Sequence, residues 1–205
     1  MHSILRSRHK LRVSPYFFNA GLLCTGPILS TVSTAYASTI AEALASSTFP
    51  SFDVLFGPAY KAIPFAATTA LTLHTHHGVS TGFAYDRKEV KDHGEGGKMV
   101  GASVSDGKRV VVLDDVMTSG KAIRGAIEMI VQQGGEVVGV VQLLDREEVG
   151  QDGKGSTVEE IEGLVGKGRV LSVLKMKDLL DWLELNTMNE DLEKMKEYRA
   201  KYGLK

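Results

Sequence analysis

The sequence is organised around the stretch Val110-Val-Val-Leu-Asp-Asp-Val-Met-Thr-Ser-Gly-Lys-Ala122. Four apolar residues end in two adjacent carboxylates, and a short Thr-Ser-Gly loop then leads into a helical pattern. This order predicts a buried strand, a loop and a helix N-terminus, where free N–H groups and the positive end of the helix dipole attract anions. We therefore expect the amides of Thr118 to Ala122 to hold a phosphate. Asp114 and Asp115 are expected to accept hydrogen bonds from the vicinal hydroxyls of a sugar.

Each of these features also has a plainer interpretation. An Asp-Asp pair is often only the polar end of a strand, and Thr-Ser is often only a helix N-cap. Two better-known phosphate loops do not fit. A P-loop needs a glycine five residues before Gly120, where this chain has Asp115, and no G-x-G-x-x-G follows the strand. A sugar-phosphate site is favoured because the paired carboxylates, the Thr-Ser-Gly loop and the helix start all occur on one strand–loop–helix frame.

Composition limits the class of protein. The chain has 205 residues, of which 43% are hydrophobic and 24% charged, as expected for one α/β domain with a small appendage. A net charge of −1 argues against a general nucleic-acid binder. The single cysteine, Cys24, cannot form an internal disulfide, which favours a reducing, cytoplasmic location. No apolar run reaches the ~18 residues of a membrane span.

Strand and helix patterns alternate along the chain. We expect strands at 52–56, 79–85, 109–113, 137–144 and 170–174, and helices at 28–45, 59–73 and 123–131, with terminal helices at 177–185 and 189–202. Such alternation indicates a mostly parallel sheet with right-handed crossovers.

Residues 86–101 have a different composition, because they are dense in charges and glycines. We expect a mobile loop there. Four of its residues carry or can carry positive charge: Arg87, Lys88, Lys91 and His93. The segment is either a solvated charge run or a lid over a highly anionic substrate.

Ligands of such sheets sit beyond the carboxyl ends of the strands. Lys61 follows one strand, so it either faces a second phosphate group or is an ordinary surface lysine. Arg146 follows another strand and offers a planar fork suited to a carboxylate. An ion pair with Asp145 or Glu147 is the equal alternative for Arg146.

Several strings resemble a known family. Val112-Leu-Asp-Asp-Val-Met-Thr-Ser-Gly resembles the phosphoribosyl-pyrophosphate (PRPP) motif of type I phosphoribosyltransferases. Three further strings are similar to those of the orotate phosphoribosyltransferases: Ser14-Pro-Tyr-Phe-Phe-Asn-Ala-Gly21, Phe56-Gly-Pro-Ala-Tyr-Lys61 and Arg87-Lys-Glu-Val-Lys-Asp-His-Gly-Glu-Gly-Gly97. The similarity runs from about residue 11 to the C-terminus.

The resemblance implies a fold and a reaction. The fold is the α/β type I phosphoribosyltransferase fold, a central, mostly parallel sheet flanked by helices. It implies a single domain over 1–205, with its core at about 26–150, a small hood from 1–25 and 170–205, and a mobile catalytic loop at 86–101. The reaction joins orotate and PRPP to give orotidine 5′-monophosphate and pyrophosphate. Mg²⁺ is implied, held mainly by PRPP and water rather than by protein ligands. A homodimer is implied too, in which each catalytic loop reaches the partner's active site.

The resemblance also assigns residues. It implies PRPP contacts from Tyr60, Lys61, Arg87, Lys88, Lys91, His93, Asp114, Asp115, Val116, Met117, Thr118, Ser119, Gly120, Lys121 and Ala122. It implies orotate contacts from Phe17, Phe18, Thr118 and Arg146, and catalytic roles for Arg87, Lys91, His93 and Asp115.

Two other functions stay open at this stage: phosphoribosyl transfer to another base, and non-catalytic regulation by PRPP binding. Arg146 argues against a purine, which has no carboxylate, and Lys91 with His93 argues against a regulator that lacks the loop. The chain departs from the family pattern at Ala62, where Gly is usual, and at Lys121, where Thr is usual. It also has His9-Lys10-Leu11-Arg12 where the family has Lys-Ser-Gly-Arg.

Overall fold

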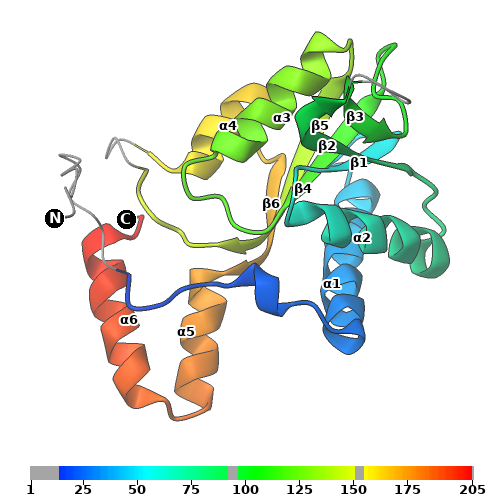
Figure 1. Ribbon diagram of the computed structural model, residues 1–205. Helices are drawn as coiled ribbons and strands as arrows, with labels where there is room; N and C mark the ends of the chain where they lie inside the picture. Colours follow the sequence, from blue (N-terminus) through cyan, green and yellow to red (C-terminus); the bar gives the residue numbers. More distant parts are fainter. Residues whose placement is uncertain (1–13, 92–96, 151–154, 205) are drawn as a thin grey trace, which may run out of the picture.

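A six-stranded sheet forms the centre of the protein (Figure 1). The structure is a computed structural model that describes residues 14–91, 97–150 and 155–204. The strand order is β3-β2-β1-β4-β5-β6, and every neighbouring pair is parallel except β2 with β3. The strands are β1 (Val54–Gly57), β2 (Gly82–Lys91), β3 (Gly97–Gly101), β4 (Arg109–Asp114), β5 (Glu136–Asp145) and β6 (Val170–Lys175). The predicted mostly parallel α/β sheet is confirmed.

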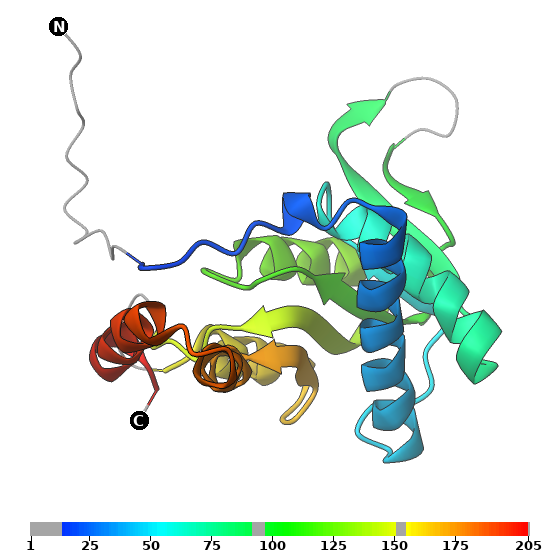
Figure 2. The ribbon, with the colours of Figure 1, turned by 90° about the horizontal axis from the view of Figure 1, so that it is seen from below.

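Helices cover both faces of the sheet. One face carries α1 (Gly26–Ala45) and α2 (Ala62–His77), and the other carries α3 (Lys121–Gln132) and α4 (Thr157–Val165) (Figure 1). A short 3₁₀ turn, η1 (Ala20–Leu22), precedes α1. The last two helices, α5 (Met176–Leu185) and α6 (Asn189–Tyr202), form a hairpin that follows the edge strand β6 (Figure 2). No helix in the described ranges combines the length and apolar character needed to cross a membrane.

The alternation of side chains along each strand produces two hydrophobic cores. In β4, Val111 and Leu113 join the core beneath α1 and α2, whereas Val110 and Val112 join the core beneath α3 and α4. All four are fully buried. A strand buried on both faces must be apolar at every position, which is why this segment reads as an unbroken hydrophobic run.

Helix α4 was not predicted. Its start carries a capping box, in which the Ser156 hydroxyl accepts a hydrogen bond from the Glu159 amide and the Glu159 carboxylate accepts one from the Ser156 amide. The Ser-x-x-Glu spacing is a recognisable signal for a helix N-terminus. Ile161 and Val165 bury the inner face of this helix against the sheet.

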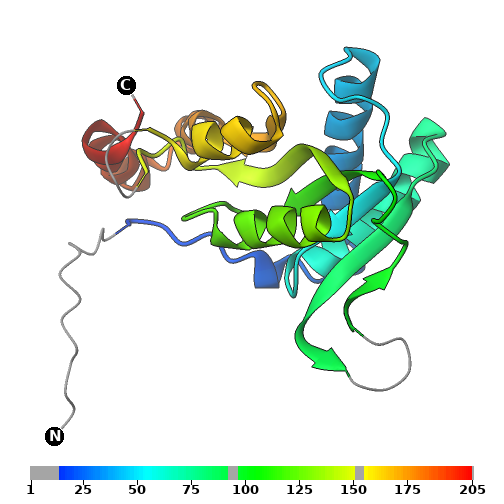
Figure 3. The same ribbon diagram turned by 90° about the horizontal axis from the view of Figure 1, so that it is seen from above.

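Two sequence expectations need correction. Residues 86–91 and 97–101 are not irregular, because they form the arms of an antiparallel hairpin that extends from the edge of the sheet (Figure 3). Backbone hydrogen bonds between strands do not need apolar side chains, so a charged, glycine-rich sequence can still pair. Residues 170–175 were assigned to the hood, yet they pair with β5 as part of the central sheet. The C-terminal appendage therefore begins at Met176.

Candidate active site

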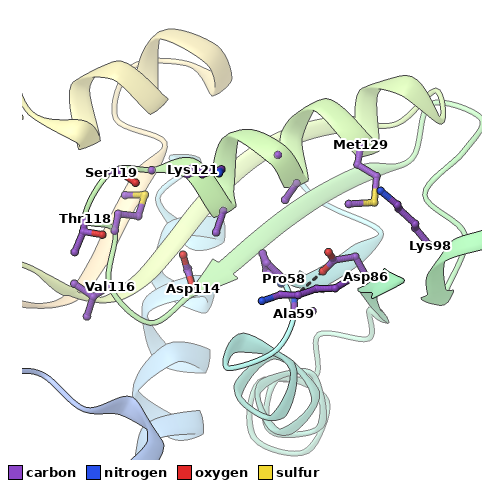
Figure 4. A pocket seen from close by; sticks show the side chains of 16 residues that line it. Pro58, Ala59, Asp86, Lys98, Asp114, Val116, Thr118, Ser119, Lys121 and Met129 are labelled. Carbon is purple, nitrogen blue, oxygen red and sulfur yellow. Dashed lines mark hydrogen bonds between the residues drawn. The ribbon is translucent and has the colours of Figure 1, made fainter. Parts of the chain in front are cut away.

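A cavity of about 690 Å³ lies at the carboxyl end of β4 (Figure 4). The residues that line it come from the loop after β1, from β2 and β3, and from the β4–α3 segment. They are Pro58, Ala59, Asp86, Lys88, Lys98, Asp114, Val116, Met117, Thr118, Ser119, Gly120, Lys121, Ala122, Gly125, Ala126 and Met129. Thr118 and Ser119 stand at one end of the cavity, and Lys98 and Met129 at the other (Figure 4). This volume suits a ligand of the size of a phosphorylated sugar.

The loop between β4 and α3 forms the end of the cavity at which the sequence predicts a phosphate. Gly120 is the N-cap of α3 and has a left-handed backbone, with φ of 67°. Helix α3 therefore begins at Lys121 and directs its first amides toward the loop, where they have no partner within the helix. The buried Gln142 of β5 fixes the loop, because its Oε1 accepts a hydrogen bond from the Met117 amide at 3.1 Å. Gln142 was not predicted from the sequence.

Asp114 and Asp115 lie at the strand end, where the sequence predicts them. Tyr36 donates a hydrogen bond to the backbone carbonyl of Asp114 at 2.7 Å, and the Asp115 amide donates to the Asp114 carboxylate at 2.9 Å. Burial and then the charge of Asp115 raise the pKa of Asp114 to about 7. The Asp115 carboxylate lies 3.6 Å from the amino group of Lys61. The pair therefore combines a carboxyl that is easily protonated with one that is held by a cation.

The loop after β1 faces the β2–β3 hairpin. The Ala59 amide donates a hydrogen bond to Asp86 Oδ1 at 2.6 Å (Figure 4). The exposed ring of Tyr60 lies 5.0 Å below the amino group of Lys88. Asp86 and Lys88 both line the cavity, whereas Arg87 does not.

The alternation of side chains along β2 explains why Asp86 and Lys88 line the cavity and Arg87 does not, because every second residue of a strand faces the same side. Reading residues 86–101 as a loop therefore missed Asp86, and it also missed Lys98 on β3. The signal that could have found them is alternation with a period of two, which places Asp86 and Lys88 on one face of a strand and Arg87 on the other.

Arg146 lies outside the cavity lining and in a cluster of its own. Its Nε donates a hydrogen bond to the Tyr16 hydroxyl at 2.8 Å, and Nη2 lies 2.6 Å from a carboxylate oxygen of Glu148. Burial raises the pKa of Tyr16 to about 12. The alternative prediction, an ion pair of Arg146 with Asp145 or Glu147, named the wrong carboxylate. The carboxylate that Arg146 contacts belongs to Glu148.

The N-terminal aromatic residues are not gathered in the cavity. Phe17 is 82% exposed, and Phe18 packs against the core formed with α1 and α2. Two further predicted residues cannot be placed. His93 lies outside the described residues, and Lys91 is described only as the last residue of β2. The structure thus brings together Asp114 and residues 116–122, which were predicted to bind a sugar phosphate, but not the predicted orotate residues.

The described residues contain no cluster of metal-binding side chains. Within the described ranges, no three or more His, Cys, Asp or Glu side chains lie close enough together to hold a metal ion. A divalent cation at Asp114 and Asp115 would therefore need most of its ligands from the substrate and from water, which is how Mg²⁺ is commonly held beside phosphates.

The chain is similar to known proteins over most of its length. A family model described as a phosphoribosyl transferase domain matches residues 32–161. The orotate phosphoribosyltransferase of Acinetobacter baumannii (strain ACICU) is 45% identical over 193 residues, which cover 94% of this chain and 85% of that protein. The one from Thioalkalivibrio sulfidiphilus (strain HL-EbGR7) is 44% identical over 194 residues, covering 94% and 87%.

A solved structure agrees with these sequence relatives. The crystal structure of orotate phosphoribosyltransferase from Francisella tularensis has a TM-score of 0.78 and 35% identity, and the match covers 94% of this chain and 89% of that one. The chain therefore belongs to the phosphoribosyl transferase family and, within it, to the orotate phosphoribosyltransferases.

Proposed function

We infer that this protein transfers the ribose 5-phosphate group of PRPP to orotate, giving orotidine 5′-monophosphate and pyrophosphate in the synthesis of UMP. The observation that carries this inference is the cavity at the end of β4, which is lined by Asp114 and by the start of α3, with the Asp115 carboxylate beside Lys61 at the same strand end. Carboxylates suit the hydroxyls of a ribose phosphate, and a helix N-terminus suits its phosphate group. The chain as a whole belongs to the orotate phosphoribosyltransferases.

We propose that the β4–α3 loop holds the 5′-phosphate. The amides from Thr118 to Ala122 supply donors, and the start of α3 adds favourable partial charge. Lys121 lines the same part of the cavity and adds a full positive charge where the family pattern, by the resemblance, has Thr. Asp114 and Asp115 accept hydrogen bonds from the ribose hydroxyls, and the carboxylate oxygens are already oriented by backbone amides.

The pyrophosphate of PRPP would lie toward the cations at the other side of the cavity. Lys88 and Lys98 line it, and Lys61 with Tyr60 stands beside it on the loop after β1. Arg87 is assigned to the same end by the resemblance. Mg²⁺ bound with PRPP would neutralise part of the pyrophosphate charge and help it to leave.

The reaction breaks the bond between ribose C1 and a pyrophosphate oxygen and forms a bond between C1 and orotate N1. Positive charge develops on the ribose and negative charge on the leaving group, as in glycoside cleavage. Orotate N1 is acidic, so no strong base is needed. The protein acts mainly by orientation and by charge stabilisation, with Asp115 at the ribose and Lys91, Arg87 and His93 at the leaving group.

For orotate, we propose contacts from Phe17, Phe18, Thr118 and Arg146. The guanidinium of Arg146 has five donors. Among the described residues its Nε bonds Tyr16 and its Nη2 contacts Glu148, Ser14 and Tyr198, so these bonds use Nε and Nη2 and leave Nη1 for a ligand. It can therefore pair with the carboxylate of orotate. The aromatic rings of Phe17 and Phe18 are suited to lie along the pyrimidine.

We also propose a homodimer in the cytoplasm, in which the segment 86–101 of each subunit reaches the partner's active site. The resemblance to the family supports this arrangement, and so does the outward direction of the β2–β3 hairpin (Figure 3). Lys91 and His93 would act from that segment.

The test is to incubate the purified protein with PRPP, Mg²⁺ and orotate and to follow the loss of orotate absorbance. Consumption of orotate with release of pyrophosphate is the expected result. Consumption of another base but not orotate would indicate transfer to that base. Binding of PRPP with no consumption of any base would indicate a regulator instead.

A further inference from the structure

Side chains of α3 and α4 that do not line the cavity hold the loop between β4 and α3 (residues 115–120), called the phosphate loop below. The hydroxyl of Thr157, the first residue of α4, donates a hydrogen bond to the Thr118 carbonyl at 3.0 Å. The guanidinium of Arg124 donates through Nη2 to the Ser119 carbonyl, while its Nη1 pairs with Glu160 of α4 at 2.8 Å. Two consecutive carbonyls of the loop are therefore held by side chains that do not line the cavity.

Peptide geometry links these carbonyls to the amides that follow them. In a planar trans peptide the N–H points opposite to the C=O. Because the Thr118 carbonyl is directed at Thr157, the Ser119 amide is directed away from it, and the same holds for the Gly120 amide relative to Arg124. Within the part of the chain that the structure describes, neither amide donates to a protein acceptor. Both are thus oriented donors available to a ligand.

The contact between α4 and the loop is close. Gly120 has φ of +67°, and a Cβ there would come within 2.8 Å of Thr157 Cγ2 and 3.1 Å of Arg124 Nη2. Thr157 is itself only 9% exposed. The capping box of Ser156 and Glu159 closes the first turn of α4, and Thr157 lies in that turn with its hydroxyl on the Thr118 carbonyl.

We propose that Thr157 and Arg124 are positioning residues for the 5′-phosphate of the substrate. They hold two loop carbonyls so that the amides of Ser119 and Gly120 face the phosphate before it binds. This inference rests on the proposed function of the cavity. Its energetic basis is preorganisation, since donors that are already oriented lose less freedom on binding.

The test compares Thr157→Val, which removes the hydroxyl at nearly constant volume, with Thr157→Ser, which keeps it. Affinity for ribose 5-phosphate is measured by calorimetry, so that the readout does not depend on orotate chemistry. One hydrogen bond corresponds to roughly 3–10-fold in affinity, and Thr157→Val should weaken binding by that factor. Thr157→Ser should bind as the wild type does.

Thr75→Val is the matched control. The Thr75 hydroxyl also donates to a backbone carbonyl at 3.0 Å, but it does so on α2, away from the cavity. It should leave the affinity unchanged. In steady-state assays Thr157→Val should raise KM for PRPP and leave KM for orotate unaltered, a split that a general loss of stability does not produce.

Arg124→Met is the second variant, and it keeps the proposal testable if Thr157→Val does not fold. It removes both polar contacts of the guanidinium and retains most of the aliphatic stem, and it should also weaken ribose 5-phosphate binding. Wild-type affinity in a folded Thr157→Val or Arg124→Met protein overturns the inference. A wild-type protein that binds ribose 5-phosphate but consumes no orotate contradicts the proposed function instead and leaves this inference standing.

Discussion

Replacing Asp114 with asparagine should stabilise the fold at neutral and alkaline pH and weaken substrate binding. The pKa of Asp114 is raised from 3.8 to about 7, first by burial and then by the charge of Asp115. The folded protein therefore holds this proton more tightly than the unfolded chain does. The sign follows from proton linkage: the contribution is least unfavourable below about pH 4, and stability falls as the pH rises from about 4 to about 7.

The magnitude follows from the window between the two pKa values. The slope is about 1.4 kcal/mol per pH unit inside this window and falls to zero above pH 7, so the wild type should lose roughly 2–3 kcal/mol from this group between pH 5 and pH 8. For a chain of this size, that corresponds to ~5–10 °C in Tm. Asparagine does not titrate and keeps an Oδ1 to accept from the Asp115 amide, so Asp114→Asn should avoid this loss.

The assay is thermal unfolding of the wild type and Asp114→Asn at pH 5 and pH 8. The Tm advantage of the variant should be ~5–10 °C larger at pH 8 than at pH 5. Asp191→Asn removes an exposed carboxylate from the first turn of α6, far from the cavity, and its effect should be the same at both pH values. An equal advantage for Asp114→Asn at the two pH values would refute the reasoning. In activity assays the variant should show a raised KM for PRPP, because an amide nitrogen cannot accept from a ribose hydroxyl.

The remaining predictions concern the proposed catalytic segment, the loop between β4 and α3, and helix α4. Lys91→Ala should lower turnover by ~10²–10³ with little change in Tm, and an unchanged kcat would exclude a catalytic role. Mixing Lys91→Ala with Asp115→Ala subunits should recover part of the activity, because one site of each mixed dimer is intact; no recovery after demonstrated subunit exchange would mean that the segment acts within its own chain. Gly120→Ala should cost ~1–3 kcal/mol in unfolding experiments, since a Cβ at φ of +67° is strained and meets Thr157. Gly163→Ala, in the interior of α4 with no atom near its Cβ, should instead stabilise by ~0.5–1 kcal/mol.

Much of the fold and part of the site were predictable from the sequence. The strand–loop–helix frame from Val110 to Ala122 was predicted correctly, and so were the parallel sheet and the places of Asp114 and Asp115. These features depend on local signals, because an apolar run, a turn residue and a helical repeat act within a few residues of each other. The residues that resemble known motifs lie in the same local segments.

The structure corrected the segments whose conformation depends on distant partners. Residues 86–91 become a strand only by pairing with β3, and this pairing decides that Asp86 and Lys88, rather than Arg87, line the cavity. Arg146 contacts Glu148 and Tyr16, a choice that depends on how the N-terminal segment crosses the end of β5.

The sequence by itself determined the class of fold, the loop between β4 and α3 and its paired carboxylates, because hydrophobic pattern and turn chemistry depend on consecutive residues. Only the tertiary structure decided which side chains from distant parts of the sequence contact that loop. Thr157 is 39 residues from Thr118, and no periodicity relates the two. Their hydrogen bond exists because α4 packs on the same face of the sheet as α3, and that packing follows from contacts across the whole domain.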